Sequence, residues 1–150
     1  FDLFGGKAPK REFTITQDDL EQTLEAFSPS ADDSIEYCIL GCPHYTYAQI
    51  EEVERLLGGE KAKADIHILT SAAIKREAKE SGLEDRLLDL GADLIADTCV
   101  DEACCWGYLA GKSGVTDSPK GAYYMETAGI RMAVRDTATC IHWAKQGRVC

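Results

Sequence analysis

Short apolar runs alternate with amphipathic segments along most of the chain. The runs are mostly four to six residues long and rich in Ile, Leu, Val and Ala, which is typical of strands buried on both faces of a parallel sheet. Each run ends at polar or turn-forming residues. The runs that predict strands are residues 35–40, 65–69, 92–96, 114–115 and 130–134.

The segments between these runs have helical periodicity and recognisable ends. In residues 47–57, apolar side chains recur three and four positions apart, Thr46 and Gln49 form a potential capping box, and Gly58 marks the end. Similar signals predict further helices at residues 17–27, 72–81, 84–90 and 137–146. The first of these has one apolar face, so we expect it to cover another surface.

Strands that alternate with helices at this spacing predict a parallel sheet with helices on both faces. We therefore expect a three-layer α/β sandwich with a mainly parallel, Rossmann-type sheet over residues 17–150. Residues 1–16 contain Gly5, Gly6 and Pro9 and lack helical periodicity, which is typical of a linker. We expect this linker to follow an N-terminal domain.

Composition narrows the possible partners. With 150 residues, 45% of them hydrophobic and 28% charged, the chain is long enough for one domain with a real core. The net charge of −10 and the scattered 16 basic residues argue against a nucleic-acid or anionic-membrane partner. No apolar run reaches the length of a membrane span and no signal segment opens the sequence, so we expect a cytoplasmic protein.

Seven cysteines in such a chain indicate metal or thiol chemistry more than disulfides. In a parallel sheet the loops after the strands meet at one edge. These loops carry Cys42, His44, Ser71, Cys99, Ser118, Lys120 and Cys140. Three thiols beside hydroxyls and an ammonium suit a metal or iron-sulfur centre next to an anion site. Without a C-x-x-C pair, a zinc finger is not expected.

Each of these residues also has a structural interpretation. A cysteine at the end of a strand can be a small buried hydrophobic residue. Ser118 and Lys120 can mark a capped helix start with a solvated Lys. Cys104 and Cys105 are adjacent, and in an extended chain their side chains diverge, so we do not expect them to bind one metal jointly.

Several short motifs, in this order and spacing, resemble the large catalytic subunit of aconitase X. They are LGCPH at 40–44, IEEVERLLGG at 50–59, TS at 70–71, DTC at 97–99, TDSPKGAYY at 116–124 and the helix that contains Cys140. Because large subunits of this family are considerably longer, the chain resembles their C-terminal portion alone.

The resemblance implies an iron-sulfur-dependent hydro-lyase that removes water from a small hydroxy acid, such as cis-3-hydroxy-L-proline or mevalonate 5-phosphate. It further implies a 4Fe-4S or 2Fe-2S cluster with Cys99 and Cys140 as ligands, Cys42 in reserve and a third ligand from the N-terminal part of the large subunit. That N-terminal part and a small swivelling subunit or domain are the expected partners.

For the remaining site residues the resemblance implies contact with the reacting substrate. His44, Ser118 and Lys120 are the catalytic candidates, and Ser71, Thr116, Ser118 and Lys120 are the substrate-binding candidates. We expect the segment to be inactive alone, because two of three cluster ligands are insufficient for assembly. The alternative function is a non-catalytic α/β module that binds an anion or metal and serves as an interaction domain.

Overall fold

Five strands form one parallel sheet in the order β3-β2-β1-β4-β5, which confirms the predicted fold class. The structure is a computed structural model that describes residues 5–27 and 33–150. The strands are β1 (Tyr37–Tyr45), β2 (Asp65–Thr70), β3 (Ala92–Ala96), β4 (Ser113–Thr116) and β5 (Arg131–Val134). From β1 the chain first extends the sheet through β2 to β3 and then returns to add β4 and β5 on the other side.

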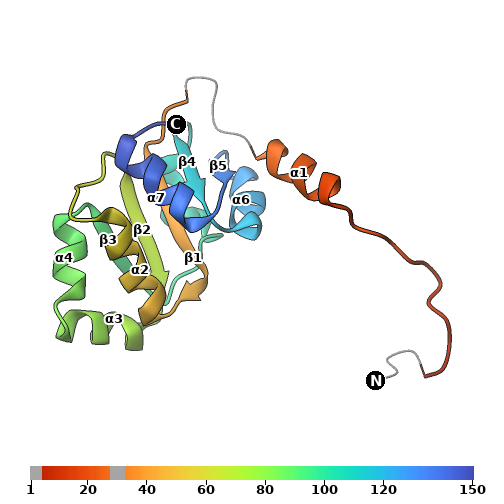
Figure 1. Ribbon diagram of the computed structural model, residues 1–150, viewed down its shortest axis with the longest axis horizontal. Coiled ribbons are helices and arrows are strands. Elements are labelled where there is room, and N and C mark those ends of the chain that lie inside the picture. Colours follow the sequence, from red (N-terminus) through yellow and green to blue (C-terminus); the bar gives the residue numbers. More distant parts are fainter. Residues whose placement is uncertain (1–4, 28–32) are drawn as a thin grey trace.

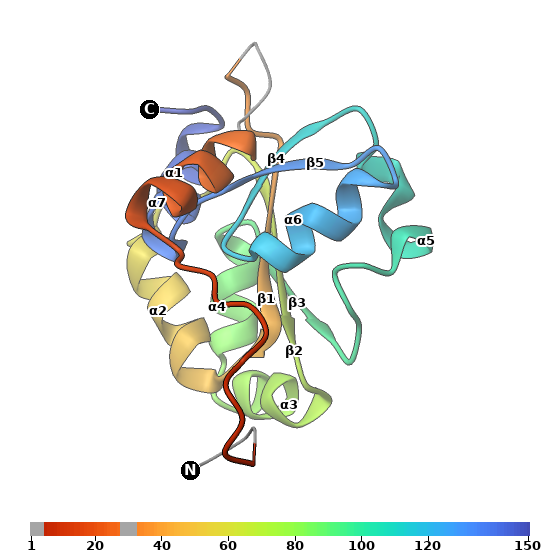
Figure 2. The same cartoon turned by 90° about the vertical axis from the view of Figure 1, so that its right-hand side faces the viewer.

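Helices cover both faces of this sheet, so the body has three layers (Figures 1 and 2). On one face lie α2 (Tyr47–Leu57), α3 (Ala72–Glu80), α4 (Leu83–Asp89) and α7 (Thr137–Gln146). The other face is covered by α5 (Ala103–Trp106), the 3-10 helix η1 (Gly107–Leu109) and α6 (Pro119–Glu126). Within the described ranges, no helix has the length and apolar character that crossing a bilayer requires.

Each face of the sheet has its own hydrophobic core because strand side chains alternate between faces. In β1, Cys38 and Leu40 face the α2 and α7 side, whereas Tyr37 and Ile39 face the α5 and α6 side. All four are buried. The two cores therefore place Cys38 and Cys140 on one face of the sheet and Cys42 on the other.

The carboxyl end of β1 departs from regular pairing at Gly41. The register with β2 shifts between Leu40 and Tyr45, and Tyr45 then pairs with Thr70, whose hydroxyl donates to the Tyr45 carbonyl at 2.7 Å. Gly41 has a φ of 95°, and a Cβ atom there would lie 2.2 Å from the Leu69 carbonyl oxygen. Only glycine fits this turn.

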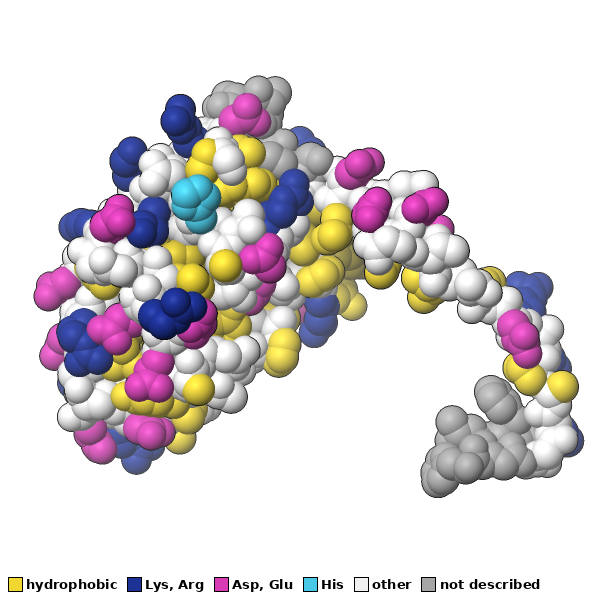
Figure 3. Space-filling model, viewed as in Figure 1, with side chains coloured by type: hydrophobic (Ala, Val, Ile, Leu, Met, Phe, Trp, Pro, Cys, Tyr) yellow, Lys and Arg dark blue, Asp and Glu magenta, His cyan; other side chains and the backbone are white. Residues whose placement is uncertain are grey.

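Helix α1 (Gln17–Ala26) differs from its expected role. It begins at Thr16 with the predicted type of cap, here a complete capping box, but none of its residues is buried. It lies beside the three-layer body at the end of an extended arm (Figure 1). Acidic side chains follow one side of α1 and hydrophobic ones the other (Figure 3). Residues 5–16 form no helix or strand, and residues 1–4 of the expected linker lie outside the described residues.

Two helical segments on the α6 side were missing from the sequence prediction. Helix α5 and η1 have no side-chain cap and together span only seven residues. They therefore lack both a capping signal and a run long enough to show helical periodicity. Helix α6 begins with Pro119 after the N-cap Ser118, which is the capped start that the structural interpretation of Ser118 described. Phe27 packs, partly buried, against the hydrophobic core to which Ala122 of α6 belongs.

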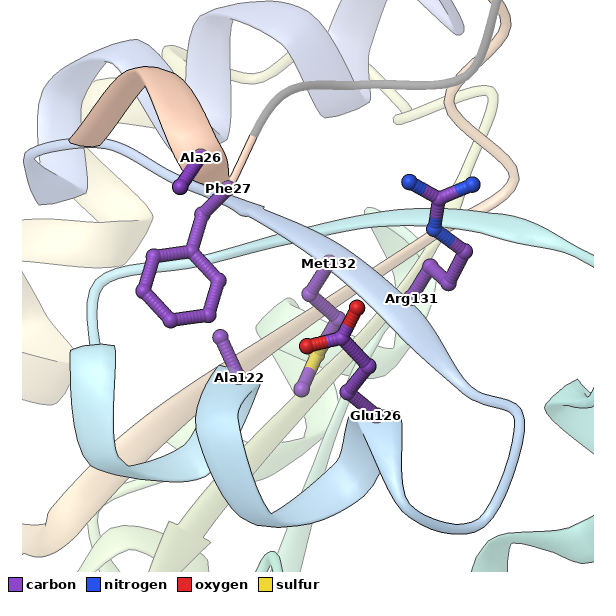
Figure 4. Close-up of a pocket in the computed structure, with 6 residues that line it drawn as sticks. All are labelled: Ala26, Phe27, Ala122, Glu126, Arg131 and Met132. Atoms are coloured by element: carbon purple, nitrogen blue, oxygen red, sulfur yellow. The ribbon is translucent and has the colours of Figure 1, made fainter. Parts of the chain in front are cut away.

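A cavity at this contact is too small to be a ligand site. It has a volume of about 10 Å³, which corresponds to one water molecule at most. The side chains of Phe27 and Ala122 face each other across it (Figure 4). It is lined by Ala26, Phe27, Ala122, Glu126, Arg131 and Met132. The carboxyl edge of the sheet is the other place where this topology predicts a ligand site.

The cap of α7 gives a first testable prediction, on pH. The Asp136 carboxylate accepts from the backbone N–H of Thr139 at 3.0 Å, and this bond lowers the pKa of Asp136. Because the pKa of Asp136 is lower in the folded protein than in the unfolded chain, where it is near 3.9, the ionised carboxylate stabilises the fold above that pH. This stabilisation is lost as the pH falls through the folded-state pKa. We expect Asp136→Ala to cost about 1 kcal/mol at pH 7 and less at pH 3, below the unfolded pKa. Urea unfolding at both pH values measures this, and an equal cost at both would contradict the cap's ionic character.

Candidate functional site

A cleft lies where the loops after β1 and β3 approach the start of α6. In a sheet of this topology, the crevice outside the carboxyl ends of the strands is the usual ligand site. The cleft has a volume of about 170 Å³. It is lined by Gly41, Cys42, Pro43, His44, Leu69, Thr98, Cys99, Val100 and Lys120. Four of the residues predicted from sequence, Cys42, His44, Cys99 and Lys120, therefore meet here.

Two thiols lie in this cleft. Cys42 follows the Gly41 turn, which directs the chain away from regular β1 pairing, and it packs partly buried against the α6-side core. Cys99 is half-buried, and its thiol donates to the Asp101 carboxylate, a bond that raises the pKa of Cys99. A neighbouring cation would have the opposite effect, because positive charge stabilises the thiolate.

His44 connects the two loops that carry these thiols. Its Nε2 atom lies 2.7 Å from the Thr98 carbonyl oxygen. Because a carbonyl oxygen only accepts, Nε2 carries the hydrogen, and Nδ1 is left as the acceptor in the neutral ring. His44 is exposed, so this nitrogen is accessible for proton transfer.

Lys120 supplies the cation of the cleft. Its side chain is exposed, and its ammonium lies 5.7 Å from the centre of the Tyr124 ring. Ser118, two residues earlier, is buried, and its hydroxyl accepts from the Gly121 backbone N–H at 3.0 Å as the cap of α6. The Lys can therefore reach an anionic group in the cleft, whereas Ser118 shapes the helix start.

The other two predicted substrate-binding hydroxyls also have structural partners. Thr116 is buried and accepts from the Ser118 backbone N–H at 3.2 Å. Ser71 caps α3 by accepting from the Ile74 backbone N–H at 3.3 Å. Contact of Ser71, Thr116 or Ser118 with a substrate stays a prediction.

Cys140 lies apart from the two cleft thiols. It is in the first turn of α7, has 0% exposure and belongs to the core on the α2 and α7 face. Its thiol lies 3.5 Å from the Arg135 carbonyl oxygen and beside Cys38, whose pKa is raised, chiefly by burial. The structure thus brings Cys42 and Cys99 together and places Cys140 on the opposite face of the sheet.

A second hollow lies between α2 and the start of α7. Its volume is about 330 Å³, and Tyr45 and Thr137 are among the residues that line it. The Tyr45 hydroxyl donates to Asp117, and the Thr137 hydroxyl donates to the same carboxylate at 3.1 Å. Burial, followed by the bond to Asp117, raises the pKa of Tyr45. This network ties β1, β4 and α7 together and contains neutral hydroxyls.

Two residues outside the predicted set of catalytic, substrate-binding and metal residues shape the Cys99 loop. The buried Trp106 donates from its indole Nε1 to the Cys99 carbonyl at 3.2 Å. Asp97 has a φ of 54°, and its carboxylate accepts from the Ala72 backbone N–H at 2.9 Å. A non-glycine residue in this left-handed region occurs at constrained turns. The aromatic residue after the Cys pair was the one available signal for Trp106.

The thiols of the cleft fit part of the ligand set of an iron-sulfur cluster. Clusters are held by several cysteine thiolates, and Cys42 and Cys99 provide two beside one cleft. Among residues 5–27 and 33–150, however, no group of three or more His, Cys, Asp or Glu side chains is arranged to hold a metal ion. A complete set would need a further ligand or a rearrangement of these residues.

Comparison with known proteins gives one consistent family. The family model described as the third domain of aconitase X matches residues 35–146. The large subunit of phosphomevalonate dehydratase from Thermococcus kodakarensis is 27% identical over 85% of the chain, and cis-3-hydroxy-L-proline dehydratase from Pseudomonas aeruginosa is 24% identical over 97%. The crystal structure of the Thermococcus aconitase X in its holo form superimposes with a TM-score of 0.75 and 26% identity over 92% of the chain.

The chain corresponds to only part of each of these proteins. It spans 33% of the Thermococcus large subunit, 26% of the Pseudomonas dehydratase and 36% of the crystallised chain. The residues matched by the family model contain all five strands, the cleft residues Cys42 and Cys99, and the buried Cys38 and Cys140.

Proposed function

The chain belongs to the aconitase X family, and from that premise we propose that it is part of an iron-sulfur-dependent hydro-lyase that removes water from a small hydroxy acid. The observation that carries this proposal is the meeting of two thiols, an imidazole and an ammonium at one cleft on the carboxyl edge of the sheet. The named relatives are dehydratases, which supports the same reaction class.

Each cleft residue has a distinct proposed role. Cys99 and Cys42 would hold the cluster together with a ligand from outside this group. Cys140, one of the two ligands preferred from sequence, would reach the cluster only if the start of α7 rearranged. When bound, the cluster supplies a Lewis acid that polarises the hydroxyl group of the substrate. His44, fixed through Nε2 to Thr98, would move a proton at Nδ1.

Lys120 would bind the anionic group of the substrate. An ammonium at the rim of a cleft suits a carboxylate or a phosphate, and both candidate substrates carry at least one such group. The names of the two relatives contain these substrates, phosphomevalonate and cis-3-hydroxy-L-proline. We propose that the substrate is a hydroxy acid of this class. A small subunit and the N-terminal part of a large subunit would complete the enzyme, which would act in the cytoplasm.

The Lys120 role gives a second prediction, on substrate affinity. We expect Lys120→Met to raise the KM about tenfold with little change in kcat, because a charge-assisted hydrogen bond at a partly solvated position contributes about 1.5 kcal/mol. Lys112→Met is the matched control, since Lys112 also lies over a tyrosine ring, that of Tyr108, but does not line the cleft. A KM that rises equally in both variants would remove Lys120 from the substrate site.

The proposed function is tested on the protein expressed from its full-length gene together with its small subunit, purified without oxygen. Iron and acid-labile sulfide content, the visible absorbance and dehydration of both candidate substrates are the measurements. We expect bound iron and sulfide and turnover of at least one hydroxy acid. A protein without iron and without turnover would leave the non-catalytic anion- or metal-binding module as the function.

A further inference from the structure

Two further thiols lie close together outside the cleft, on the single turn of α5. Cys104 and Cys105 are both exposed, and their sulfur atoms are 3.9 Å apart. The sequence pattern suggested that adjacent side chains would diverge, as in a strand. In the helical turn they instead point to the same side, because successive residues are separated by about 100° rather than 180°.

We propose that Cys104 and Cys105 form a bidentate site for a thiophilic metal or metalloid ion, separate from the candidate active site. This inference does not depend on the proposed dehydratase function. It rests on the separation of the two sulfurs, on their exposure and on the Glu102 carboxylate beside them.

The separation of the sulfurs suits a bridging ion better than a disulfide. A thiolate-bound metal such as zinc lies about 2.3 Å from each sulfur, so two bonds at a tetrahedral angle place the sulfurs about 3.8 Å apart. That value matches the 3.9 Å between Cys104 and Cys105. The Cα atoms of adjacent residues are only about 3.8 Å apart, below the usual minimum of about 4.4 Å for a disulfide.

The charges around the pair favour a cation. The Glu102 carboxylate lies 4.0 Å from the Cys104 sulfur. A soft ion bound by both sulfurs would neutralise this charge, since soft thiolates select soft ions.

Occupation of this site would also affect the neighbouring cleft. Trp106 directly follows Cys105 in α5, and its indole donates to the Cys99 carbonyl. An ion that fixes both sulfurs therefore fixes the helical turn on which the Cys99 loop rests. Trp106 provides an optical signal for binding, because tryptophan emission depends on its surroundings.

Phenylarsine oxide, a trivalent arsenical that requires two nearby thiols, is a suitable test reagent. Two arsenic–sulfur bonds form, the arsenic–oxygen bond breaks, and both thiol protons leave with that oxygen as water. Arsenic stays trivalent and no sulfur is oxidised. Excess glutathione in the same solution removes arsenic from single thiols, so that only a dithiol retains it.

The experiment treats the reduced protein, expressed from its full-length gene, with one equivalent of the arsenical and excess glutathione. Intact-mass analysis should show one phenylarsenic group per chain, and alkylation of the remaining thiols should leave residues 104–105 protected. We expect retention to fall at least tenfold in Cys104→Ser and in Cys105→Ser, with altered tryptophan emission on binding to the unmodified protein only. Circular dichroism confirms that the variants are folded.

Two controls make the outcome decisive. Cys150→Ser removes another exposed thiol and should retain the arsenical fully. Cys99→Ser breaks the thiol pair of the cleft and should also retain it. Undiminished retention in Cys104→Ser and Cys105→Ser would overturn the proposal, as would retention that only Cys99→Ser abolishes, because the dithiol would then lie in the cleft.

Discussion

Replacing Gly41 by alanine is expected to lower the free energy of unfolding by about 4 kcal/mol or more, the largest effect of any single methyl group considered for this chain. The added Cβ would lie 2.2 Å from the Leu69 carbonyl oxygen and 2.9 Å from its nitrogen. Both atoms belong to the backbone of β2, so the neighbour cannot move aside as a flexible side chain would. Gly41 also has a φ of 95°, which an alanine adopts only with strain.

Gly59→Ala is the matched control for this prediction. Gly59 also has a positive φ, 78°, but no atom lies within 4 Å of a Cβ placed there. We expect it to cost about 1–2 kcal/mol from backbone conformation alone. Urea unfolding of both variants separates the two contributions. Equal losses in the free energy of unfolding would show that the close approach of Gly41 to Leu69 does not add to the cost of the methyl group.

The fold could be predicted from sequence because its strongest signals are local. The capping box at Thr46 and Gln49 and the left-handed Gly58 fix the ends of α2 as expected. Helix α5 lacks such signals, since it is a single turn stabilised by burial of Trp106. Tertiary contacts determined this element, and sequence periodicity does not report them.

The end of β1 shows where local prediction stops. The apolar run ends at Leu40, and a strand was predicted to end there, but β1 continues through an irregular segment to Tyr45. The continuation depends on a bond from Thr70 to the Tyr45 carbonyl, 25 positions apart in the chain. The irregular segment is also the part of β1 that carries Cys42 and His44 into the cleft.

Topology predicted which residues would share an edge but not where their side chains would point. The convergence of Cys42, His44, Cys99 and Lys120 on one cleft is what the parallel sheet implied. Cys140 follows a strand in the same way, yet the first turn of α7 directs its thiol into the core. The direction of the Cys140 thiol depends on which face of α7 packs on the sheet. Only the structure shows that face.

The cluster ligands are the subject of the prediction with the largest expected effect on activity. We expect Cys99→Ser to abolish bound iron, acid-labile sulfide and turnover in the anaerobically purified complete enzyme. The substitution replaces one sulfur by one oxygen at a half-buried position, so the free energy of unfolding of the cluster-free protein should change by less than about 1 kcal/mol. Metal analysis and urea unfolding, measured side by side, distinguish loss of a ligand from loss of the fold.

Cys42→Ser and Cys140→Ser decide which thiol accompanies Cys99. Because Cys42 lines the same cleft, we expect its variant to lose iron as Cys99→Ser does. Cys140→Ser buries a hydroxyl among apolar side chains, so it should retain iron and lose about 1–3 kcal/mol of stability. The reverse pattern, with iron lost only from Cys140→Ser, would mean that the start of α7 rearranges to turn this thiol out of the core. Since the Asp136 cap fixes that start, such a rearrangement would also break the bond from Thr139.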